Sequence, residues 1–262
     1  MNIEIAQVSR IGGRRTNQDR VASEAAGEAV LLVLADGMGG TQRGEVAAEI
    51  ALEVMLAAFR DAANPMVEDP AAFFQATMEA AHTAILGYAR EQGLWDPPGT
   101  TCVACLVQRD TAWWAHIGDS RCYLLRDGRI ARRTRDHSLY QDLVDRGVLR
   151  ADGVGFHPER GVLTGCLGGF EPPRPDVAPP LALAAGDVIL LCSDGLWGQF
   201  PEERFAEALA EPPLARALDD LAKAADREGG RLSDNVTAIA MRWEPGTAES
   251  LRLAGAADAR SG

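Results

Sequence analysis

The sequence contains no apolar run that approaches the ~18 residues needed to cross a bilayer as a helix. Its first residues, Met1 to Ile5, lack the basic start and the long apolar segment of a secretory signal peptide. These absences predict a soluble, cytoplasmic protein without a membrane partner.

Positive charge is also scarce, with 26 Lys and Arg against 38 Asp and Glu and a formal net charge of -12. This balance argues against nucleic acid as the main partner, because a phosphate backbone is bound chiefly by basic side chains. An acidic chain can still bind phosphate locally, where metal ions or a few arginines reverse the sign. The 262 residues are 47% hydrophobic and 24% charged, which is typical of one large folded domain.

Residues that bind soft metals are few and scattered. The five cysteines are an odd number in apolar contexts, as expected for small buried residues in a reducing compartment. Cys102 and Cys105 have the spacing of half a zinc site, but no second pair follows, and positions i and i+3 of a strand face opposite sides. The histidines are His82, His116, His137 and His157. None has metal-ligand spacing to another, so no zinc site is expected among them.

One stretch organises the chain: an unbroken apolar run from Val30 to Ala35 is followed by Asp36 and by glycines at positions 37, 39 and 40. The absence of polar alternation predicts a strand covered on both faces, although so short a run also fits a helix. Glycines let a ligand approach the backbone, and an Asp beside bare carbonyls suits a hard cation. Taken alone, an ordinary turn with an Asx bond explains Asp36 equally well.

Hydrophobic periodicity predicts strands and helices along the whole chain. The predicted strands lie at about 3–8, near Val21, and at 30–35, 101–108, 111–117, 121–126, 129–133, 181–183, 187–192 and 236–243; the predicted helices lie at about 45–59, 70–93, 201–210 and 213–228. Residues 138–165 are poor in helical pattern and rich in charge and glycine, which predicts an insertion lying over the rest. The tail 245–262, rich in Ala and Gly, is expected to be disordered.

The pattern of a strand ending in an aspartate recurs at Asp119 and Asp194, and Asp234 precedes the last predicted strand. Ends of antiparallel neighbours lie side by side, so these residues can converge with Asp36 at one edge of the core. Each Asp singly is more commonly a turn or cap residue. Four ionised carboxylates cannot crowd together without cations, and ligands that are all oxygen favour magnesium or manganese over zinc.

Two close divalent ions predict phosphate chemistry. They lower the pKa of a bridging water and neutralise a phosphoryl group under in-line attack. An arginine fork matches the phosphate oxygens, and Arg14 and Arg15 lie in the loop before the strands that lead to Asp36. Without the carboxylates, this pair would be a solvated surface patch.

Eight short motifs occur in the order seen in metal-dependent protein phosphatases of the type 2C class, which the chain resembles from about residue 3 to 243. The motifs are Arg14-Arg15-Thr16-Asn17-Gln18-Asp19, Ala35-Asp36-Gly37-Met38-Gly39-Gly40, Gly99-Thr100-Thr101, Gly118-Asp119-Ser120-Arg121, Arg135-Asp136-His137-Ser138, Leu163-Thr164, Ser193-Asp194-Gly195-Leu196-Trp197 and Ser233-Asp234-Asn235-Val236-Thr237. Each motif alone is weak, and the ordered set is specific. The chain is most similar to the compact bacterial branch of the family.

The resemblance implies an α+β fold, a four-layer αββα sandwich of two antiparallel sheets flanked by helix pairs. Residues 1–244 would form a single catalytic domain, with a flap at about 138–165. The implied function is a protein serine/threonine phosphatase that hydrolyses phosphoserine and phosphothreonine by attack of a metal-bridging hydroxide. It would oppose a bacterial Ser/Thr kinase in signalling and act on phosphorylated proteins. A monomer is expected, because the sequence shows no coiled coil or extra interface segment.

The resemblance also assigns roles to residues. Asp36 would bridge two Mn2+ or Mg2+ ions, with the Gly37 carbonyl on one of them, and Asp194 and Asp234 would complete that pair. Asp119 would hold a third ion together with Asp194. Two further residues have roles outside the inner ligands: Arg14 would bind the substrate phosphate, and Asp19 would be an outer-shell ligand acting through water.

The chain departs from the family pattern at three places. Gln18 stands where many members have Glu, which removes a negative charge near the metals. Met38 stands where some members have a proton-donating His, so a metal-bound water is the expected general acid. Gly161 and Gly165 predict a more flexible flap and altered substrate choice. Two alternatives remain: a phosphoprotein-binding pseudophosphatase, and a hydrolase of small phosphate esters on the same metals.

Overall fold

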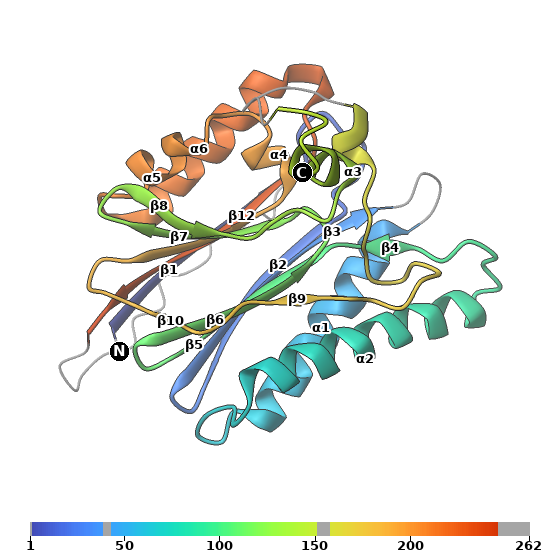
Figure 1. Ribbon diagram of the computed structural model, residues 1–262, viewed down its shortest axis with the longest axis horizontal. Helices are drawn as coiled ribbons and strands as arrows, with labels where there is room; N and C mark the ends of the chain where they lie inside the picture. Colours follow the sequence, from blue (N-terminus) through green and yellow to red (C-terminus); the bar gives the residue numbers. More distant parts are fainter. Residues whose placement is uncertain (1, 39–42, 151–157, 246–262) are drawn as a thin grey trace.

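The chain forms a four-layer sandwich in which two antiparallel sheets are stacked between two layers of helices (Figure 1). The structure is a computed structural model, and it describes residues 2–38, 43–150 and 158–245. The four-layer α+β architecture predicted from the sequence is confirmed. The tail was expected to be disordered, and its residues from 246 onward lie outside the described ranges. Gly39 and Gly40 lie outside them as well.

In the first sheet, the first strand of the chain pairs with the last one. Its strand order is β1 (Asn2–Arg10), β12 (Val236–Glu244), β11 (Val188–Cys192), β7 (Arg121–Arg126) and β8 (Arg129–Arg133). Its outer face packs against α4 (Asp194–Trp197), α5 (Glu203–Ala208) and α6 (Leu214–Gly229). The two longer helices agree with the prediction, and the single turn of α4 directly after β11 was not foreseen.

The second sheet contains the stretch that ends in Asp36. Its strand order is β10 (Leu181–Ala182), β6 (Thr111–Ile117), β5 (Cys102–Gln108), β3 (Ala29–Met38) and β2 (Asp19–Ala26), while β4 (Gly99–Thr100) pairs with β3 and β9 (Asp176–Val177) pairs with β6. It packs against α1 (Gly44–Ala62) and α2 (Pro70–Glu91). Asp69 caps α2: its side chain accepts a hydrogen bond of 3.0 Å from the Ala72 N–H. No helix among the described residues meets the length and hydropathy needed for a membrane span.

Burial on both faces explains the apolar run of β3. Leu31 and Val33 pack in the cluster beneath α1 and α2, whereas Leu32 and Leu34 pack between the two sheets. All four are fully buried, and burying one such side chain stabilises the fold by about 1.5–3 kcal/mol. Neighbouring β5 shows the same division, with Cys102 in the first cluster and Cys105 in the second, so the expected opposite orientation of these two cysteines is confirmed.

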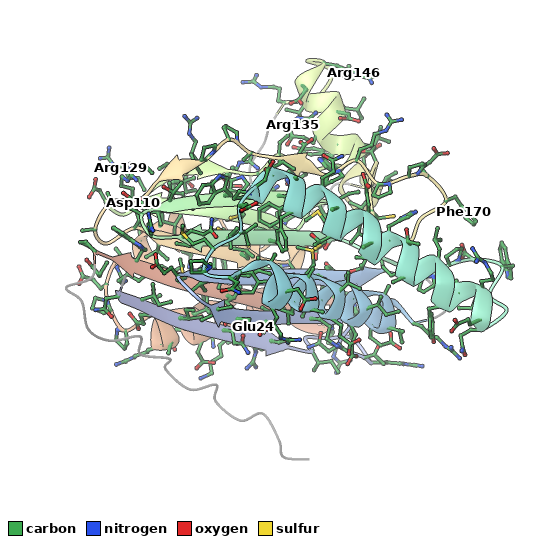
Figure 2. All side chains as sticks on the ribbon, turned by 90° about the horizontal axis from the view of Figure 1, so that it is seen from below. Glu24, Asp110, Arg129, Arg135, Arg146 and Phe170 are labelled. Carbon is green, nitrogen blue, oxygen red and sulfur yellow. The ribbon has the colours of Figure 1, made fainter. Side chains whose placement is uncertain are left out.

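The expectation that the flap is poor in helix was wrong in its first part. Ser138 begins α3 (Leu139–Asp145), and its hydroxyl accepts a hydrogen bond from the Gln141 N–H at 3.2 Å. Two turns of helix are too short to produce a clear periodic pattern. Figure 2 shows α3, with Arg146 at its end, standing out from the body of the sandwich. The middle of the predicted flap, residues 151–157, lies outside the described ranges.

Candidate metal and phosphate site

Both sheets contribute carboxylates to one cluster. Asp19 and Asp36 are directly opposite one another where β2 pairs with β3 in the second sheet. Asp194 follows β11 and Asp234 precedes β12 in the first sheet, while Asp119 lies between β6 and β7, which belong to different sheets. The prediction of convergence, argued from one antiparallel sheet, therefore needed a second sheet stacked on the first.

The pKa values show how closely these groups approach. Burial raises the pKa of Asp36 well above its usual value, and the negative charges of Asp19 and Asp194 raise it further, followed by those of Asp119 and Asp234. Burial likewise raises the pKa of Asp194 to about 7, with the charge of Asp234 next in importance. The pKa of Asp119 is raised first by burial and then by Asp194. Without counter-charge, the cluster resists ionisation.

Two oxygen atoms in this cluster have no hydrogen-bond partner among the described residues. They are Asp19 Oδ1 and Asp194 Oδ1, and both are buried. The other oxygen of Asp19 accepts a hydrogen bond of 2.9 Å from the Ser193 hydroxyl. A buried carboxylate oxygen without a donor is costly, and a hard divalent cation satisfies it. The donor set thus fits Mn2+ or Mg2+, although the assignment of individual ligands stays a prediction.

Gly37 lies where α1 crosses β3. A Cβ at this position would stand 2.2 Å from the Gly44 carbonyl oxygen, so no larger residue fits without moving the helix. The Gly37 N–H donates to the Gln18 carbonyl at 3.2 Å. The amide of Gln18 in turn donates to Glu45 at 3.2 Å, so the residue that replaces the usual Glu is held by α1. The metal-binding role of the Gly37 carbonyl is not tested by these contacts.

The loop that carries Arg14 is pressed against the Asp234 turn. Gly12 has a φ of +62°, and a Cβ there would lie 2.0 Å from the Asp234 carbonyl oxygen. Arg14 Nη2 donates to Asp234 Oδ2 at 2.6 Å, yet 57% of its side chain is exposed. The guanidinium is therefore positioned at the carboxylate cluster and accessible to a phosphate. Arg15, also exposed, is not part of this ion pair.

Asn235 holds the Arg14 loop in place, a role that the sequence analysis did not identify. Its amide nitrogen donates to the carbonyls of Ile11 at 2.8 Å and Thr16 at 3.0 Å, and its amide oxygen accepts from the Gln18 N–H at 2.9 Å. One side chain thus bonds three parts of the loop. The signal was present, because Asn235 belongs to one of the eight motifs, but a motif does not reveal the partner of a hydrogen bond.

Thr101 links the segments that carry Asp36 and Asp119. Its hydroxyl accepts a hydrogen bond of 3.0 Å from the Asp36 N–H and shares a second, of 2.8 Å, with the hydroxyl of Ser120. Both hydroxyl-bearing residues are buried. They join the end of β3 to the loop after β6, so the two carboxylates have a common support.

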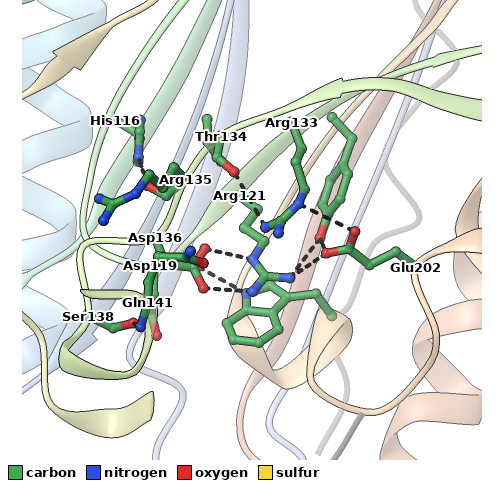
Figure 3. Close-up of polar contacts among 12 residues, drawn as sticks. His116, Asp119, Arg121, Arg133, Thr134, Arg135, Asp136, Ser138, Gln141 and Glu202 are labelled. Atoms are coloured by element: carbon green, nitrogen blue, oxygen red, sulfur yellow. Dashed lines mark hydrogen bonds and ion pairs between the residues drawn. The ribbon is translucent and has the colours of Figure 1, made fainter. Parts of the chain in front are cut away.

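Arg121 forms the centre of a buried network beneath Asp119 (Figure 3). It donates two hydrogen bonds to Asp136, of 2.7 and 2.6 Å, and a third to Glu202 at 2.6 Å. Its guanidinium lies 3.5 Å from the centre of the Trp197 ring, whose N–H donates to the Asp119 carbonyl at 3.0 Å. The backbone of Asp119 is thereby fixed by a desolvated, fully paired arginine.

Similarity to known proteins agrees with this geometry. The sequence matches the family described as protein phosphatase 2C over residues 6–143. It is 37% identical over 229 residues to the serine/threonine protein phosphatase PstP of Mycobacterium tuberculosis, a match that covers 86% of this chain and 42% of that protein. The chain therefore spans less than half the length of this relative.

Solved structures resemble the chain over nearly all of its length. A serine/threonine phosphatase of S. agalactiae has a TM-score of 0.83 at 29% identity, with 92% of this chain and 100% of that chain covered. The catalytic domain of PstP in complex with two manganese ions has a TM-score of 0.78 at 35% identity, with 92% and 97% covered. One structure similar to this chain therefore contains manganese.

Proposed function

Because the chain belongs to the protein phosphatase 2C family, we propose that it is a metal-dependent protein serine/threonine phosphatase that hydrolyses phosphoserine and phosphothreonine. The carboxylate cluster carries the proposal. It gathers five aspartates, and two of their buried oxygens have no hydrogen-bond donor within the described ranges, beside the exposed guanidinium of Arg14. Such a site has the two halves that phosphate hydrolysis requires, a place for divalent cations and a fork for the phosphoryl oxygens.

Asp36, Asp194 and Asp234 would hold two divalent ions, and Asp119 with Asp194 would hold a third, with Asp19 in the outer shell. When bound, the ions supply a coordinated water of lowered pKa and positive charge for the phosphoryl oxygens. Mn2+ or Mg2+ fits a donor set made only of oxygen. The two manganese ions in the similar PstP structure support this choice for the first two positions.

The chain's own residues orient the substrate. Arg14 would donate from its guanidinium to two phosphate oxygens, exchanging its bond with Asp234 for one with the substrate. Asn235 would keep the loop at a fixed distance from the cluster while this exchange occurs. An exposed fork on a fixed loop accepts a phosphorylated side chain presented by a protein surface.

Release of phosphate from phosphopeptides tests the function. The chain, freed of metal with a chelator, should be inactive on phosphoserine and phosphothreonine peptides and should regain activity on addition of Mn2+. Rates on small phosphate esters, measured in parallel, should be lower in kcat/KM than those on peptides. Tight binding of phosphopeptides without turnover would support the pseudophosphatase instead, and preference for small esters would support the third alternative.

Arg14→Ala should lower kcat/KM on phosphopeptides roughly 30-fold, chiefly through KM, because charge-assisted hydrogen bonds to phosphate contribute about 2 kcal/mol. Arg15→Ala is the matched control and should stay within about threefold of wild type, as expected for a surface charge. Steady-state kinetics at saturating Mn2+ measure both. Equal losses in the two variants would show that the loop contributes general positive charge and that Arg14 is not a specific ligand.

The partners belong to the same proposal. Phosphoproteins are substrates of the named serine/threonine phosphatases that resemble this chain, and a Ser/Thr kinase must produce them. We place the reaction in the cytoplasm and the enzyme in the monomeric state. All five cysteines are free thiols and four of them are buried, which suits a reducing compartment.

A further inference from the structure

Three side chains with metal-ligand chemistry meet outside the aspartate cluster. They are His116 in β6, His137 just before α3, and Asp176 in β9. Each offers a ligand atom, and these atoms lie within 4.8 Å of one another. The sequence analysis expected no metal site among the histidines, since their spacing along the chain is wrong. The fold brings three residues that are distant in the sequence close together.

The pairing of two strands and the contact between two imidazole rings bring this cluster together, and we call it the His–His–Asp site. His116 and Asp176 are directly opposite one another where β6 pairs with β9, so their side chains share a face. His137 Nε2 lies 3.2 Å from Asp176 Oδ2, and the two imidazole rings are tilted by 35° with centroids 4.6 Å apart. His137 Nδ1 accepts a long hydrogen bond of 3.4 Å from the Gly118 N–H, a contact that metal binding at Nε2 would replace, because the ring proton would then be on Nδ1. The site is thus formed by three separate segments of the chain.

The neutral tautomer of His116 leaves one ring nitrogen able to bind a metal ion. Its Nε2 lies 2.6 Å from the carbonyl oxygen of Arg135 and must donate to it (Figure 3). The neutral ring then has its lone pair on Nδ1, which is buried and has no hydrogen-bond partner in the described part of the chain. His116 itself is 3% exposed, and burial lowers its pKa to about 4. A metal-bound imidazole commonly donates its other N–H to a backbone carbonyl, as this one does.

We propose that His116, His137 and Asp176 bind a divalent transition-metal ion such as zinc, at a site separate from the aspartate cluster. Two imidazoles and one carboxylate form a borderline donor set that selects zinc-like ions over Mg2+. Ligand atoms around tetrahedral zinc are about 3.3 Å apart, close to the 3.2 Å that already separates His137 from Asp176. The side chain of Asp176 is 62% exposed and can adjust, which leaves a fourth position open to water.

Nearby positive charge does not prevent binding. His116 and Asp176 line a cavity of about 230 Å3, and Arg133 and Arg135 also line it. Arg135 is paired with Asp142, and with Asp145 as well, while Arg133 lies 3.5 Å from Glu202. These pairs neutralise the two guanidinium groups, and the cavity gives the ion a path from solvent.

An ion in this position would join the two ends of the flap. His137 comes directly before Ser138, where the flap begins, and Asp176 lies in the strand that follows the connector after it. The backbone N–H of His137 also donates to the backbone carbonyl of Gly118 at 2.9 Å, and Gly118 is next to Asp119. The His–His–Asp site would therefore fix the flap relative to the loop that carries Asp119.

Cobalt is a suitable spectroscopic probe, because tetrahedral Co2+ with nitrogen ligands absorbs strongly in the visible and octahedral Co2+ with oxygen ligands absorbs weakly. The full chain should be freed of metal, placed in excess Mg2+ to fill sites made only of oxygen, and titrated with Co2+. We expect intense bands that saturate at one equivalent and disappear when zinc is added. The readout is independent of phosphatase activity, so the outcome does not depend on the proposed function.

Asp176→Asn should weaken Co2+ binding at least about tenfold, because it removes one of three ligands at an exposed position that tolerates the change. Asp61→Asn, at an exposed position of α1, is the matched control and should leave the titration unchanged. His137→Ala is a second test and should abolish the intense bands while the variant still melts cooperatively. Absence of these bands in the wild type, or an unchanged titration in both site variants, would overturn the proposal.

Discussion

Asp194→Asn and Asp36→Asn should each lower Mn2+-dependent phosphate release by at least about 1000-fold, because a lost metal ion removes several kcal/mol of transition-state stabilisation. Both carboxylates belong to the cluster, where the charge of Asp194 raises the pKa of Asp36. Asparagine keeps the shape and one oxygen but removes the charge that makes the site attractive to a divalent ion. Steady-state rates at increasing Mn2+ measure the loss.

The same substitutions should not unfold the chain. The aspartates repel one another when no metal is present, so removing one charge should leave the melting temperature of the metal-free protein unchanged or higher. Asp220→Asn, at an exposed position of α6, should retain full activity and serves as the control. Activity of either site variant within tenfold of wild type would contradict the assignment of Asp36 and Asp194 as ligands. Loss of folding would show a structural role instead.

Local patterns in the sequence predicted most of the fold. Strands β5 to β8 were predicted within about a residue because alternation and two-residue turns depend on neighbours in sequence. Asp127 and Gly128, which join β7 to β8, form such a turn and both have positive φ. The short helices α3 and α4 were missed, since one or two turns carry too little periodicity. Their positions depend on capping and on packing against other elements.

Contacts between distant residues could not be predicted in the same way. The aspartates were chosen because each lies at a strand end, and the fold does bring them together. The hydrogen bonds of Asn235 to Ile11 and Thr16 span more than 200 residues, and no periodic pattern records them. The pairing of β6 with β9, which places His116 opposite Asp176, is likewise a contact between distant residues that no periodic pattern records. Strand register is a tertiary property, so the His–His–Asp site is visible only in the structure.

Removal of metal should make stability depend on pH in a direction opposite to ordinary acid denaturation. In the folded state, burial raises the pKa of Asp19 to about 6 and that of Asp194 to about 7, from 3.8 for an exposed aspartate. Between these values the folded chain binds more protons than the unfolded chain. The stabilising contribution of these groups is therefore complete below pH 3.8 and is lost as the pH rises through about 6 to 7.

The size of this effect is measurable. The shift of Asp19 alone, about two pKa units, corresponds to about 3 kcal/mol between the low and high ends of the window. Melting temperatures of the metal-free chain should fall between pH 5 and 8, and the fall should be smaller in Asp19→Asn. In that variant Asp19 no longer titrates, and the Asp19 charge that raises the pKa of Asp36 and Asp194 is also removed, so both changes make the fall smaller. If the melting temperature of the metal-free wild type fell no more over this range than that of Asp19→Asn, the prediction would be refuted.

Added Mn2+ should reverse this dependence. Protons and divalent ions compete for the same carboxylate oxygens, so the ion binds weakly at pH 5 and tightly at pH 8. Its stabilisation grows with the ratio of free ion to dissociation constant, and the increase in melting temperature should therefore be largest at pH 8. The aspartate cluster destabilises the metal-free chain most at high pH, and binding of the ion there should stabilise the chain most at the same high pH. We expect that gain to arise at the buried oxygens of Asp19 and Asp194, which have no hydrogen-bond donor in the part of the chain that the structure describes.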